Sequence, residues 1–387
     1  MNNFPTWVEI DLDAFRWNLE WIKKNISDVS ILLVVKADAY GHGAVRISKF
    51  ARECGVDMLG VATVDEGVQL RKAGIEIPVL VLSPILEDEL DKLIENDLSA
   101  SVSTVEFAES AAGVAGRKGK ICRVHIEIDT GMGRAGLPLS KALDSVTEIC
   151  GMNHLEAEGI FTHFPAADSD EDYTRDQISA FTGMVEQLSG RGITFRYVHA
   201  ANSAAVINFP SSHFNMIRPG LSIYGHTSSV GLKDRVDIVP VMTFKSRLLL
   251  VRDVPAGSSI SYGRTYITEK PTTVGTIAVG YGHGICHRLS NRGEVLFRRQ
   301  RVPIIGRVTM DMTMVDLTGF DNPSAGEEVV IFGRQGDRQI SVDEVSQWDG
   351  TLNYEVLTRI SKRVVRVYIK SGRIDTLKTL YSVNENP

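Results

Sequence analysis

Residues 31–43 read ILLVVKADAYGHG, and the five apolar residues 31–35 lead directly into Lys36. The run is short and contains β-branched side chains, which predicts a buried strand rather than a helix. A lysine at the end of such a strand is partly removed from water, so its ammonium form is disfavoured and its pKa falls. The neutral amine is the nucleophile that Schiff-base chemistry needs. The ordinary alternative is a lysine whose stem follows the surface and whose charge stays in water.

The four residues Tyr40, Gly41, His42 and Gly43 complete this stretch. They predict a tight turn with exposed backbone N–H groups. Such groups are suited to bind an anion such as phosphate.

The 387-residue chain is 43% hydrophobic, which is enough for a large core and suggests about two domains. Its net charge is -6, and it lacks the excess of positive charge that nucleic-acid-binding proteins carry, so we expect no nucleic-acid partner. The first residues lack the pattern of a secretory signal, and no apolar run approaches the ~18 residues of a membrane span, so we expect a cytoplasmic protein with no membrane partner. Four scattered cysteines without C-x-x-C spacing favour reduced thiols over a metal site or disulfides: Cys54, Cys122, Cys150 and Cys286.

Eight apolar runs follow one another along the first part of the chain, separated by charged amphipathic segments such as 63–73 and 87–95. The runs are 31–37, 57–62, 77–83, 98–103, 121–129, 157–164, 195–201 and 214–224. Eight strands alternating with helices place the chain in the α/β class and close a (β/α)8 barrel, whose active site lies at the carboxyl ends of the strands. A doubly wound open sheet is the alternative, but no Gly-x-Gly-x-x-Gly motif follows the first strand.

The pattern changes near residue 226, where HTSSVGLKDRVD reads as a linker. Short strand-like segments separated by Gly, Pro and Asp then indicate a mainly β domain. We therefore expect a barrel over residues 1–235 and a mainly β domain over residues 236–387, with residues 1–12 forming a strand that joins the second domain. Ser341 is expected to cap a short helix near 341–350, and Asp13 the first helix of the chain.

Polar residues gather at the ends of the predicted barrel strands, which is the catalytic face of such a barrel. In order they are Lys36, Arg134, His163, Asn202, Ser203 and Arg218. A single histidine or arginine at a strand end is usually an ordinary hydrogen-bonded or surface residue. A succession of them at successive strand ends is difficult to explain in that way.

Two of these residues stand in glycine-containing motifs. Arg218 precedes Pro-Gly-Leu, whose backbone N–H groups are suited to hold phosphate. Arg134 lies in DTGMGRAG (129–136) and is suited to meet a carboxylate or a phenolic oxygen. A phosphate loop is the competing interpretation of DTGMGRAG, but Gly-Lys-Ser/Thr is absent.

Three motifs in the second part of the chain carry candidate residues. Tyr262 lies in SYGRTY, Met310 and Asp311 lie in GRVTMDM, and Tyr354 lies in LNYEV. A tyrosine in a loop is usually a surface aromatic residue. With cations nearby it can instead lose its proton and act as a base.

Taken together, these motifs resemble those of the alanine racemases along nearly the whole chain. The matching strings are WVEIDLDAFRWN, VVKADAYGHG, DTGMGR, THF, ANSAA, IRPGLSIYG, SYGRTY, GRVTMD and NYEV. The resemblance implies an isomerase that interconverts L- and D-alanine with pyridoxal 5′-phosphate (PLP) as cofactor and supplies D-alanine for peptidoglycan. It also implies a head-to-tail homodimer in which each active site takes groups from both subunits.

The resemblance assigns two catalytic bases, one for each face of a planar carbanion. Lys36 would bond to the cofactor and act on the D-enantiomer, and Tyr262 of the partner subunit would act on the L-enantiomer. Arg134 and the backbone of Met310 of the partner subunit would hold the substrate carboxylate. The cofactor phosphate would be held by Tyr40, Ser203, Gly220, Leu221 and Tyr354.

By the same resemblance Arg218 would face the pyridine nitrogen of the cofactor, with His163 between Arg218 and Tyr262. A guanidinium does not give up its proton at any useful pH, so it would keep that nitrogen unprotonated. This weakens the ring as an electron sink and disfavours side reactions that need a long-lived carbanion.

Three positions depart from the family pattern, and one of them, Val365 in place of the usual proline, is expected to matter little. Many relatives carry a carbamylated lysine where this chain has Glu127, and that group presents a negative charge to the arginine. Glu127 is already a carboxylate, so we expect it to orient Arg134 directly; the alternative is a solvated strand residue. The usual Tyr-Ala-Asp-Gly is Tyr281-Gly-His-Gly here, which keeps the tyrosine of the substrate entrance and changes the charge beside it. Asp311 is expected to support this region.

Three other functions stay open. A serine or broad-spectrum racemase is the first, and Tyr354 favours alanine because relatives that prefer serine tend to carry a smaller polar residue there. A PLP-dependent decarboxylase of the same barrel type is the second, but those enzymes place a glutamate where Arg218 stands. A PLP-carrier protein is the third, but it resembles the barrel alone and lacks a β domain with Tyr262.

Overall fold

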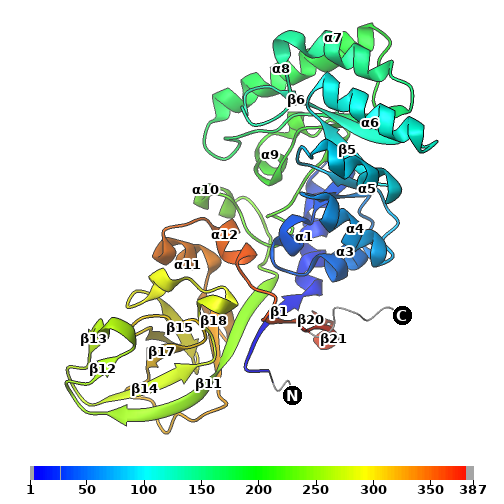
Figure 1. The fold of residues 1–387 in the computed structure, drawn as a ribbon. Helices are drawn as coiled ribbons and strands as arrows, with labels where there is room; N and C mark the ends of the chain where they lie inside the picture. Colours follow the sequence, from blue (N-terminus) through cyan, green and yellow to red (C-terminus); the bar gives the residue numbers. More distant parts are fainter. Residues whose placement is uncertain (1–3, 27, 381–387) are drawn as a thin grey trace. The chain divides into compact units, whose positions relative to one another are not determined.

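The computed structural model describes residues 4–26 and 28–380 (Figure 1). It divides into two compact units. The barrel unit contains Arg16–Ala39 and Ala44–Val239, and the β unit contains the residues up to Phe15, the segment Tyr40–Gly43 and the residues from Pro240 on. The short segment Tyr40–Gly43 thus belongs to the unit built mainly from the second part of the chain.

The barrel unit contains a closed ring of eight parallel strands in the described part of the chain. Around the ring these are β2 (Ser30–Val34), β3 (Met58–Val61), β4 (Val79–Val81), β5 (Ser99–Val102), β6 (Cys122–Asp129), β8 (Leu155–Phe161), β9 (Tyr197–His199) and β10 (Met216–Ile217). Pairing of β5 with β6 and of β10 with β2 closes the ring. The predicted (β/α)8 barrel is confirmed, and each of the eight predicted runs overlaps one of these strands.

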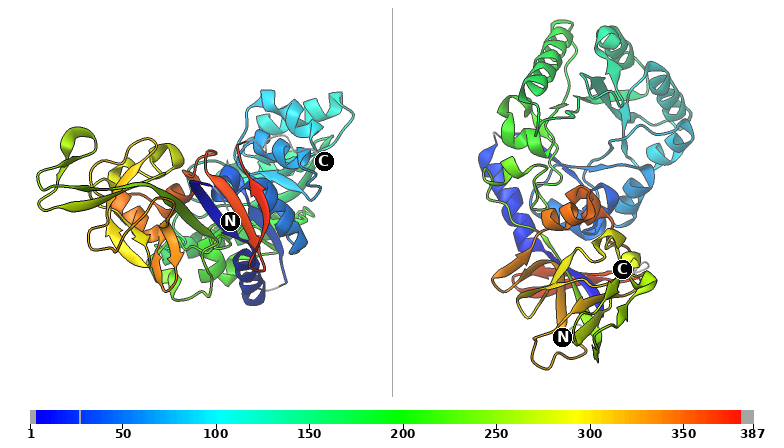
Figure 2. Two further views of the ribbon diagram at one scale, coloured as in Figure 1. Left: turned by 90° about the horizontal axis from the view of Figure 1, so that it is seen from below. Right: turned by 90° about the vertical axis from the view of Figure 1, so that its left-hand side faces the viewer.

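Helices cover the outside of this ring (Figure 2). They are α3 (Ala44–Glu53), α4 (Val64–Lys72), α5 (Leu90–Glu95), α6 (Val105–Arg117), α7 (Leu139–Cys150) and α8 (Glu171–Gly190). The two predicted amphipathic segments correspond to α4 and to α5 with the 3-10 turn η1 (Glu87–Glu89) before it. Helix α4 begins where Thr63 accepts a hydrogen bond from the Glu66 N–H, and α5 buries Leu90, Leu93 and Ile94.

Helix α1 (Leu12–Asn25) follows the first strand of the chain, β1 (Thr6–Asp11). Asp11 Oδ1 accepts hydrogen bonds from the N–H groups of Asp13 and Ala14 at 2.9 and 3.0 Å. The prediction that Asp13 caps this helix was therefore wrong by two residues, because the strand ends one residue before the helix begins.

The β unit is built on one large sheet. Its strands run in the order β16 (Gln300–Pro303), β15 (Glu294–Phe297), β18 (Glu328–Gln335), β11 (Met242–Val254), β1, β20 (Val365–Lys370) and β21 (Arg373–Lys378). Strand β1 pairs antiparallel with β11 and parallel with β20. Strands β14 (Thr272–Ile277) and β17 (Thr313–Asp316) extend from β11, β19 (Arg338–Ile340) extends from β18, and β12 (Ser259–Ile260) and β13 (Tyr266–Ile267) form a hairpin.

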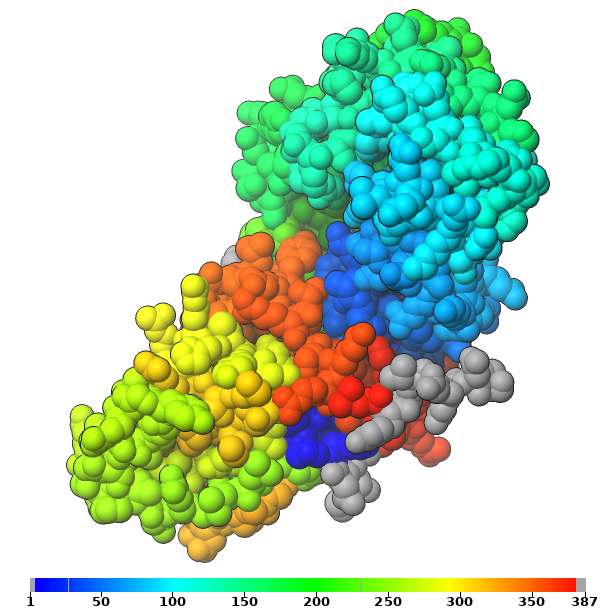
Figure 3. Space-filling view, in the orientation of Figure 1, coloured from blue at the N-terminus to red at the C-terminus, as the bar shows by residue number. Residues whose placement is uncertain are grey.

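Two helices complete the β unit, α11 (Val342–Asp349) and α12 (Asn353–Thr358), and the space-filling view shows this region of the chain at the surface in orange (Figure 3). Ser341 caps α11 as predicted, since its side chain accepts from the Glu344 N–H. Tyr354 lies in the first turn of helix α12. Among the described residues, we find no helix whose length and apolar character would let it cross a membrane, and the four cysteines are free.

Candidate active site

Lys36 opens a segment with an unusual backbone. The four residues that follow it have positive φ angles of 52°, 53°, 55° and 51° (Ala37, Asp38, Ala39 and Tyr40). Left-handed residues with a Cβ atom cost roughly 1–2 kcal/mol each, so this turn must be held by its surroundings. The turn predicted at residues 40–43 is present at Gly41 and His42, but the left-handed backbone already begins at Ala37, and residues 41–43 are buried rather than exposed.

Two carboxylates support this left-handed turn within the barrel unit. Glu66 on α4 accepts hydrogen bonds from the Ala37 N–H at 2.6 Å and from the Ala62 N–H at 2.8 Å. Asp38 Oδ1 accepts from the Ala44 N–H at 2.8 Å. Glu66 therefore joins the residue after Lys36 to the end of the neighbouring barrel strand.

The ammonium form of Lys36 is disfavoured. Burial lowers its pKa, and the positive charges of Arg134 and Arg218 lower it further, while the Glu66 carboxylate opposes them. The desolvated lysine predicted from the apolar run is thus present at the end of strand β2. A lysine of this kind supplies a neutral amine at a lower pH than an exposed one does.

Arg218 lies directly after strand β10 and is only 4% exposed. Its Nη1 donates to His199 Nδ1 at 2.8 Å, and its Nη2 contacts the Thr162 and Ala200 carbonyl oxygens at 2.8 and 3.0 Å. Burial lowers the pKa of the guanidinium to about 10, against the opposing charge of Glu127, so it stays charged at neutral pH. Nε has no acceptor among the residues described, and it is the guanidinium nitrogen left for a ligand.

His163 follows strand β8 and faces the same guanidinium, with 3.1 Å between its Nδ1 and Arg218 Nη2. Burial lowers the pKa of His163 well below its ordinary value, and the charges of Arg218, Arg134 and Lys36 act in the same direction. The ring is therefore neutral at pH 7. Because an arginine can only donate, His163 Nδ1 is the acceptor and Nε2 carries the proton.

Ser203 collects backbone donors at the start of α9 (Ser203–Asn208), a helix capped by Asn202. Its Oγ accepts from the Gly220 N–H at 2.9 Å and from the Ser222 N–H at 3.3 Å. The buried N–H of Leu221 finds no acceptor within the described segments. These groups form a small cluster of hydrogen-bond donors that contains no carboxylate, and such a cluster is suited to bind a phosphate.

Arg134 is exposed in the loop after strand β6, where Asp129 Oδ1 accepts from the Gly131 and Gly133 N–H groups at 2.9 and 3.1 Å. Glu127 is buried, and Ser103 Oγ donates to it at 3.3 Å. Burial raises the pKa of Glu127, and the charge of Arg134 opposes this. No ion pair joins Glu127 to Arg134 in the described parts of the chain, so the two groups interact here through space rather than by the direct contact we expected.

The candidate residues of the β unit are mostly exposed. Tyr262 on the turn η3 (Tyr262–Arg264) is 71% exposed and Met310 is 53% exposed. Tyr281 opens the turn η4 (Tyr281–His283), and the N–H of Gly282 donates to the Met310 carbonyl oxygen at 2.9 Å. The next residue, Asp311, forms an ion pair with Arg363 at 2.8 Å.

Tyr40 and Tyr354 lie together in the β unit, with ring centroids 6.0 Å apart and ring planes inclined by 46°. Burial raises the pKa of Tyr40, and the neighbouring Tyr354 adds to this effect. Tyr40 is therefore a neutral hydroxyl at any pH at which the protein is used, and it can donate a hydrogen bond to an anion.

The sequence analysis missed several polar residues in the barrel. They are Glu66, His125, Glu158 and His199, of which the last three are 0–6% exposed. A signal was available for His125, because it alternates with Glu127 in the strand CRVHIEID and therefore points to the same side of the sheet. No comparable pattern marks Glu66, whose contact with Ala37 spans 29 positions of the chain.

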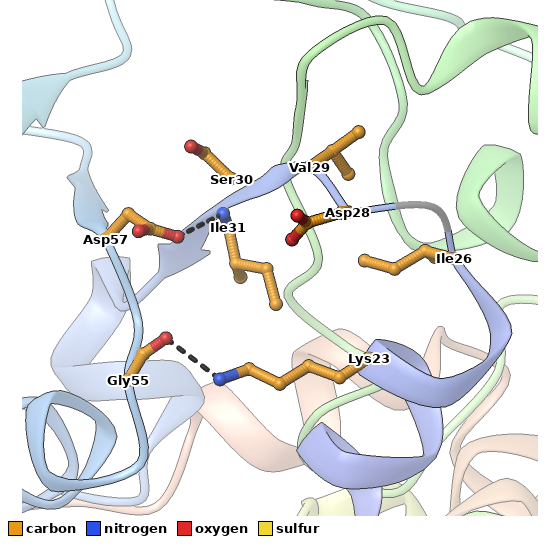
Figure 4. A pocket seen from close by; sticks show the side chains of 8 residues that line it. All are labelled: Lys23, Ile26, Asp28, Val29, Ser30, Ile31, Gly55 and Asp57. Atoms are coloured by element: carbon orange, nitrogen blue, oxygen red, sulfur yellow. Dashed lines mark hydrogen bonds between the residues drawn. The ribbon is translucent and has the colours of Figure 1, made fainter.

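A hollow of about 540 Å³ lies at the opposite end of the barrel strands (Figure 4). It is lined by residues that include Lys23, Ser30 and Asp57, and in the close-up the Lys23 side chain reaches toward Gly55 while Asp57 reaches toward Ile31. Lys23 Nζ donates to the Gly55 carbonyl oxygen at 2.9 Å, and Asp57 accepts from the Ile31 N–H at 2.7 Å. These polar groups already satisfy one another at the amino ends of the strands, so this hollow is not the candidate site.

The chain matches two family models, "Alanine racemase, N-terminal domain" over residues 10–228 and "Alanine racemase, C-terminal domain" over residues 241–368. It is 41% identical over 373 residues to an alanine racemase of Methanococcus maripaludis, covering 95% of this chain and 100% of that protein. The chain belongs to the alanine racemase family. The recognition of the family from its motifs is confirmed.

Solved structures of the alanine racemase family agree with this assignment. The alanine racemase of Clostridium difficile 630 superimposes with a TM-score of 0.94 at 35% identity, covering 98% of this chain and 99% of that one. The alanine racemase of Bacillus anthracis with bound L-Ala-P superimposes with a TM-score of 0.91 at 38% identity, covering 97% and 98% of the two chains.

Proposed function

We propose that this protein racemises alanine with PLP as its cofactor. The observation that carries the proposal is the gathering of Lys36, His163, Arg218 and the donors around Ser203 at the carboxyl ends of the barrel strands. This occurs in a chain that matches an alanine racemase over 95% of its own length. A lone lysine at a strand end would not suffice, but the set supplies a nucleophile, an anion site and a fixed cation together.

The residues present fit this cofactor. The Leu221 N–H and the hydroxyl of Ser203 offer donors to a phosphate, and the free Nε of Arg218 offers one donor to a ring nitrogen. By resemblance Gly220, Tyr40 and Tyr354 belong to the same phosphate site. Bound to Lys36, PLP supplies an electron sink that acidifies the Cα–H bond of the substrate.

Two bases, one from each subunit, would then move the Cα proton of the substrate. Lys36, whose ammonium form is disfavoured, would act on one face of the substrate, and Tyr262 of the partner subunit would act on the other face. His163 is neutral and carries its proton on Nε2, so it can donate to a phenolate and lower the cost of ionising that tyrosine. One base on each face is what inversion at Cα requires.

The charged residues around the bases position the substrate. Arg134 and the backbone of the partner subunit's Met310 would hold its carboxylate, with Glu127 and Asp311 as supporting charges and Tyr281 at the entrance. Arg218 does not give up its proton at any useful pH, so a ring nitrogen held beside it would stay unprotonated. We include in the proposal a homodimer with shared active sites, a cytoplasmic location and the supply of D-alanine to peptidoglycan.

Chiral analysis in deuterated water tests the reaction. The PLP-loaded protein is incubated separately with L-alanine and with L-serine, and the products are resolved by enantiomer and by mass. We expect deuterated D-alanine to form much faster than D-serine. Comparable D-serine would favour the alternative, a serine or broad-spectrum racemase, and carbon dioxide or no product would refute racemisation.

Complementation tests the shared active site. Lys36→Ala and Tyr262→Phe should each be inactive, since loss of a general base costs about 10²–10⁴-fold. In a 1:1 mixture allowed to exchange subunits, one of the two sites in each mixed dimer has both residues intact, so about a quarter of the wild-type activity should return. No recovery after exchange would place both bases in one subunit.

A further inference from the structure

Four buried side chains form a line of hydrogen bonds through the inside of the barrel. Arg218 Nη1 lies 2.8 Å from His199 Nδ1, and His199 Nε2 lies 2.8 Å from His125 Nδ1. His125 Nε2 lies 3.3 Å from Glu158 Oε1. All four side chains are at most 6% exposed. The line therefore connects one end of the Arg218 guanidinium to a buried carboxylate on strand β8.

The direction of every bond in this line follows from the arginine. A guanidinium has no lone pair to offer, so His199 Nδ1 must be the acceptor and His199 Nε2 must carry the proton. That proton is donated to His125 Nδ1, which leaves the second proton of the line on His125 Nε2, facing Glu158. Both imidazoles are neutral in this arrangement and all three bonds point the same way, from Arg218 toward Glu158.

The same chemistry excludes a proton wire. Passing a proton toward the ligand side would require Arg218 to accept one, and a guanidinium does not do so. The line therefore cannot deliver protons to the site. What it can do is fix the plane of the guanidinium and polarise it through consecutive bonds in a medium of low dielectric.

We propose that Glu158, His125 and His199 form an oriented hydrogen-bond relay that positions the Arg218 guanidinium. They are positioning residues and do not touch the substrate. The relay itself consists of bonds within this chain. Its effect on a bound ring nitrogen rests on the proposed function, in which Arg218 Nε faces that nitrogen.

Packing around the relay restricts both imidazoles. The His199 ring stacks on the Phe161 ring with centroids 4.9 Å apart and an interplanar angle of 4°. The Arg218 guanidinium lies 5.3 Å from the centre of the Phe161 ring. The His125 ring stacks on Tyr197 with an interplanar angle of 12°. These contacts hold the rings in the orientation that the line of bonds needs.

Gly159 makes room for the relay. A Cβ atom at this position would overlap with His125 Nδ1, the atom that accepts from His199. The φ angle of Gly159 is not positive, so the backbone alone would accept another residue there. The absence of a side chain is therefore explained by the space that the imidazole occupies.

The charges around the relay agree with neutral histidines and an ionised carboxylate. Burial lowers the pKa of His199 well below its ordinary value, and the charge of Arg218 acts in the same direction. Burial also lowers the pKa of His125, although Glu158 opposes it. For Glu158, burial raises the pKa, but the hydrogen bonds from His125 and Ser99 and the charge of Arg123 lower it, and its pKa is lowered overall.

Nitrogen-15 NMR of the full-length protein with labelled histidine tests the relay directly, with and without PLP. We expect two histidines with protonated Nε2 and bare Nδ1, unchanged between pH 6 and 9 because both rings are shielded from water. Their signals should disappear in His125→Asn and His199→Asn. A protonated Nδ1 on either ring at pH 7, or a doubly protonated ring, would overturn the proposal.

The positioning effect is tested by cofactor binding. Glu158→Gln keeps an acceptor oxygen and removes the charge, whereas Gly159→Ala leaves every polar group in place and displaces His125. Both should weaken PLP binding at least tenfold and shift the pH dependence of the cofactor's absorption band. Ser101→Ala is the matched control, because it removes a buried 2.7 Å hydrogen bond to the Val81 carbonyl oxygen in the same barrel.

The outcomes separate the relay from the proposed function. If Glu158→Gln and Gly159→Ala fold like the wild type and bind PLP with unchanged affinity and spectrum, the positioning role is refuted. If the control shows the same losses as the two variants, the effect is general destabilisation and the positioning role is again refuted. A wild-type chain that binds no PLP would refute the proposed function, and the histidine signals would still decide whether the relay exists.

Discussion

Replacing Glu66 tests what maintains the left-handed turn after Lys36. The carboxylate accepts from the Ala37 and Ala62 N–H groups at 2.6 and 2.8 Å, and both bonds are charge-assisted. Glu66→Ala removes both bonds, and Glu66→Gln keeps one acceptor oxygen and removes the charge. Asp65→Asn is the matched control, since Asp65 is the neighbouring carboxylate on α4, has a side chain that is 77% exposed and pairs with Lys92 instead.

The expected magnitude follows from these contacts. A hydrogen bond to a charged group contributes about 1.5–3 kcal/mol, and the partly exposed position of Glu66 favours the lower end. Loss of both bonds should therefore cost about 3 kcal/mol and loss of one about 1.5 kcal/mol. Four left-handed residues store roughly 1–2 kcal/mol each, so the larger loss is a substantial fraction of the strain that the turn has to sustain.

Amide hydrogen exchange of the segment 36–43 measures the effect locally. At 1.36 kcal/mol per factor of ten, exchange should accelerate about tenfold in Glu66→Gln and about a hundredfold in Glu66→Ala. The uptake of PLP should also extend to lower pH in both variants, because Glu66 raises the pKa of Lys36 and its removal favours the neutral amine. Exchange that stays at the rate of wild type and of Asp65→Asn would refute the assignment of Glu66 as the support of the turn.

Glu127→Gln should raise the KM for alanine several-fold with a smaller change in kcat, because the carboxylate acts on the substrate-binding arginine through space. Steady-state kinetics measure this beside the control Ser103→Ala, which removes only the hydroxyl donor to Glu127, and an unchanged KM in Glu127→Gln would contradict the prediction. Gly43→Ala should destabilise the protein by about 3 kcal/mol or prevent folding, because φ at this position is 96° and a Cβ atom would overlap with the Tyr368 hydroxyl. Thermal unfolding measures the loss of stability, and a melting temperature equal to that of the wild type would contradict the prediction. Tyr354→Ser should raise the ratio of serine to alanine racemisation, as measured by competition between the two substrates, and an unchanged ratio would remove Tyr354 as a determinant of specificity.

Much of the fold was predictable because the relevant signals are local. The barrel strands are short apolar runs, and those that precede Lys36, His163 and Arg218 are followed within two residues by a polar side chain. Both the number of strands and the edge on which these polar residues gather can therefore be read along the chain. The same holds for Ser341, whose capping role depends on a residue three positions away. The strand-end residues Lys36, His163 and Arg218 were found for this reason.

The sequence by itself therefore determined the class of fold, the family and the end of the barrel that carries the chemistry. Only the tertiary structure decided how these residues are held: that residues 37–40 turn left-handed, that Glu66 supports the turn, and that His199 and His125 connect Arg218 to Glu158. The hydrogen bonds among these features join residues from different strands or helices, which closure of the ring brings together. A buried hydrogen bond across a barrel leaves no periodic pattern in either of the segments that form it, and for that physical reason it could not be derived from the residues alone.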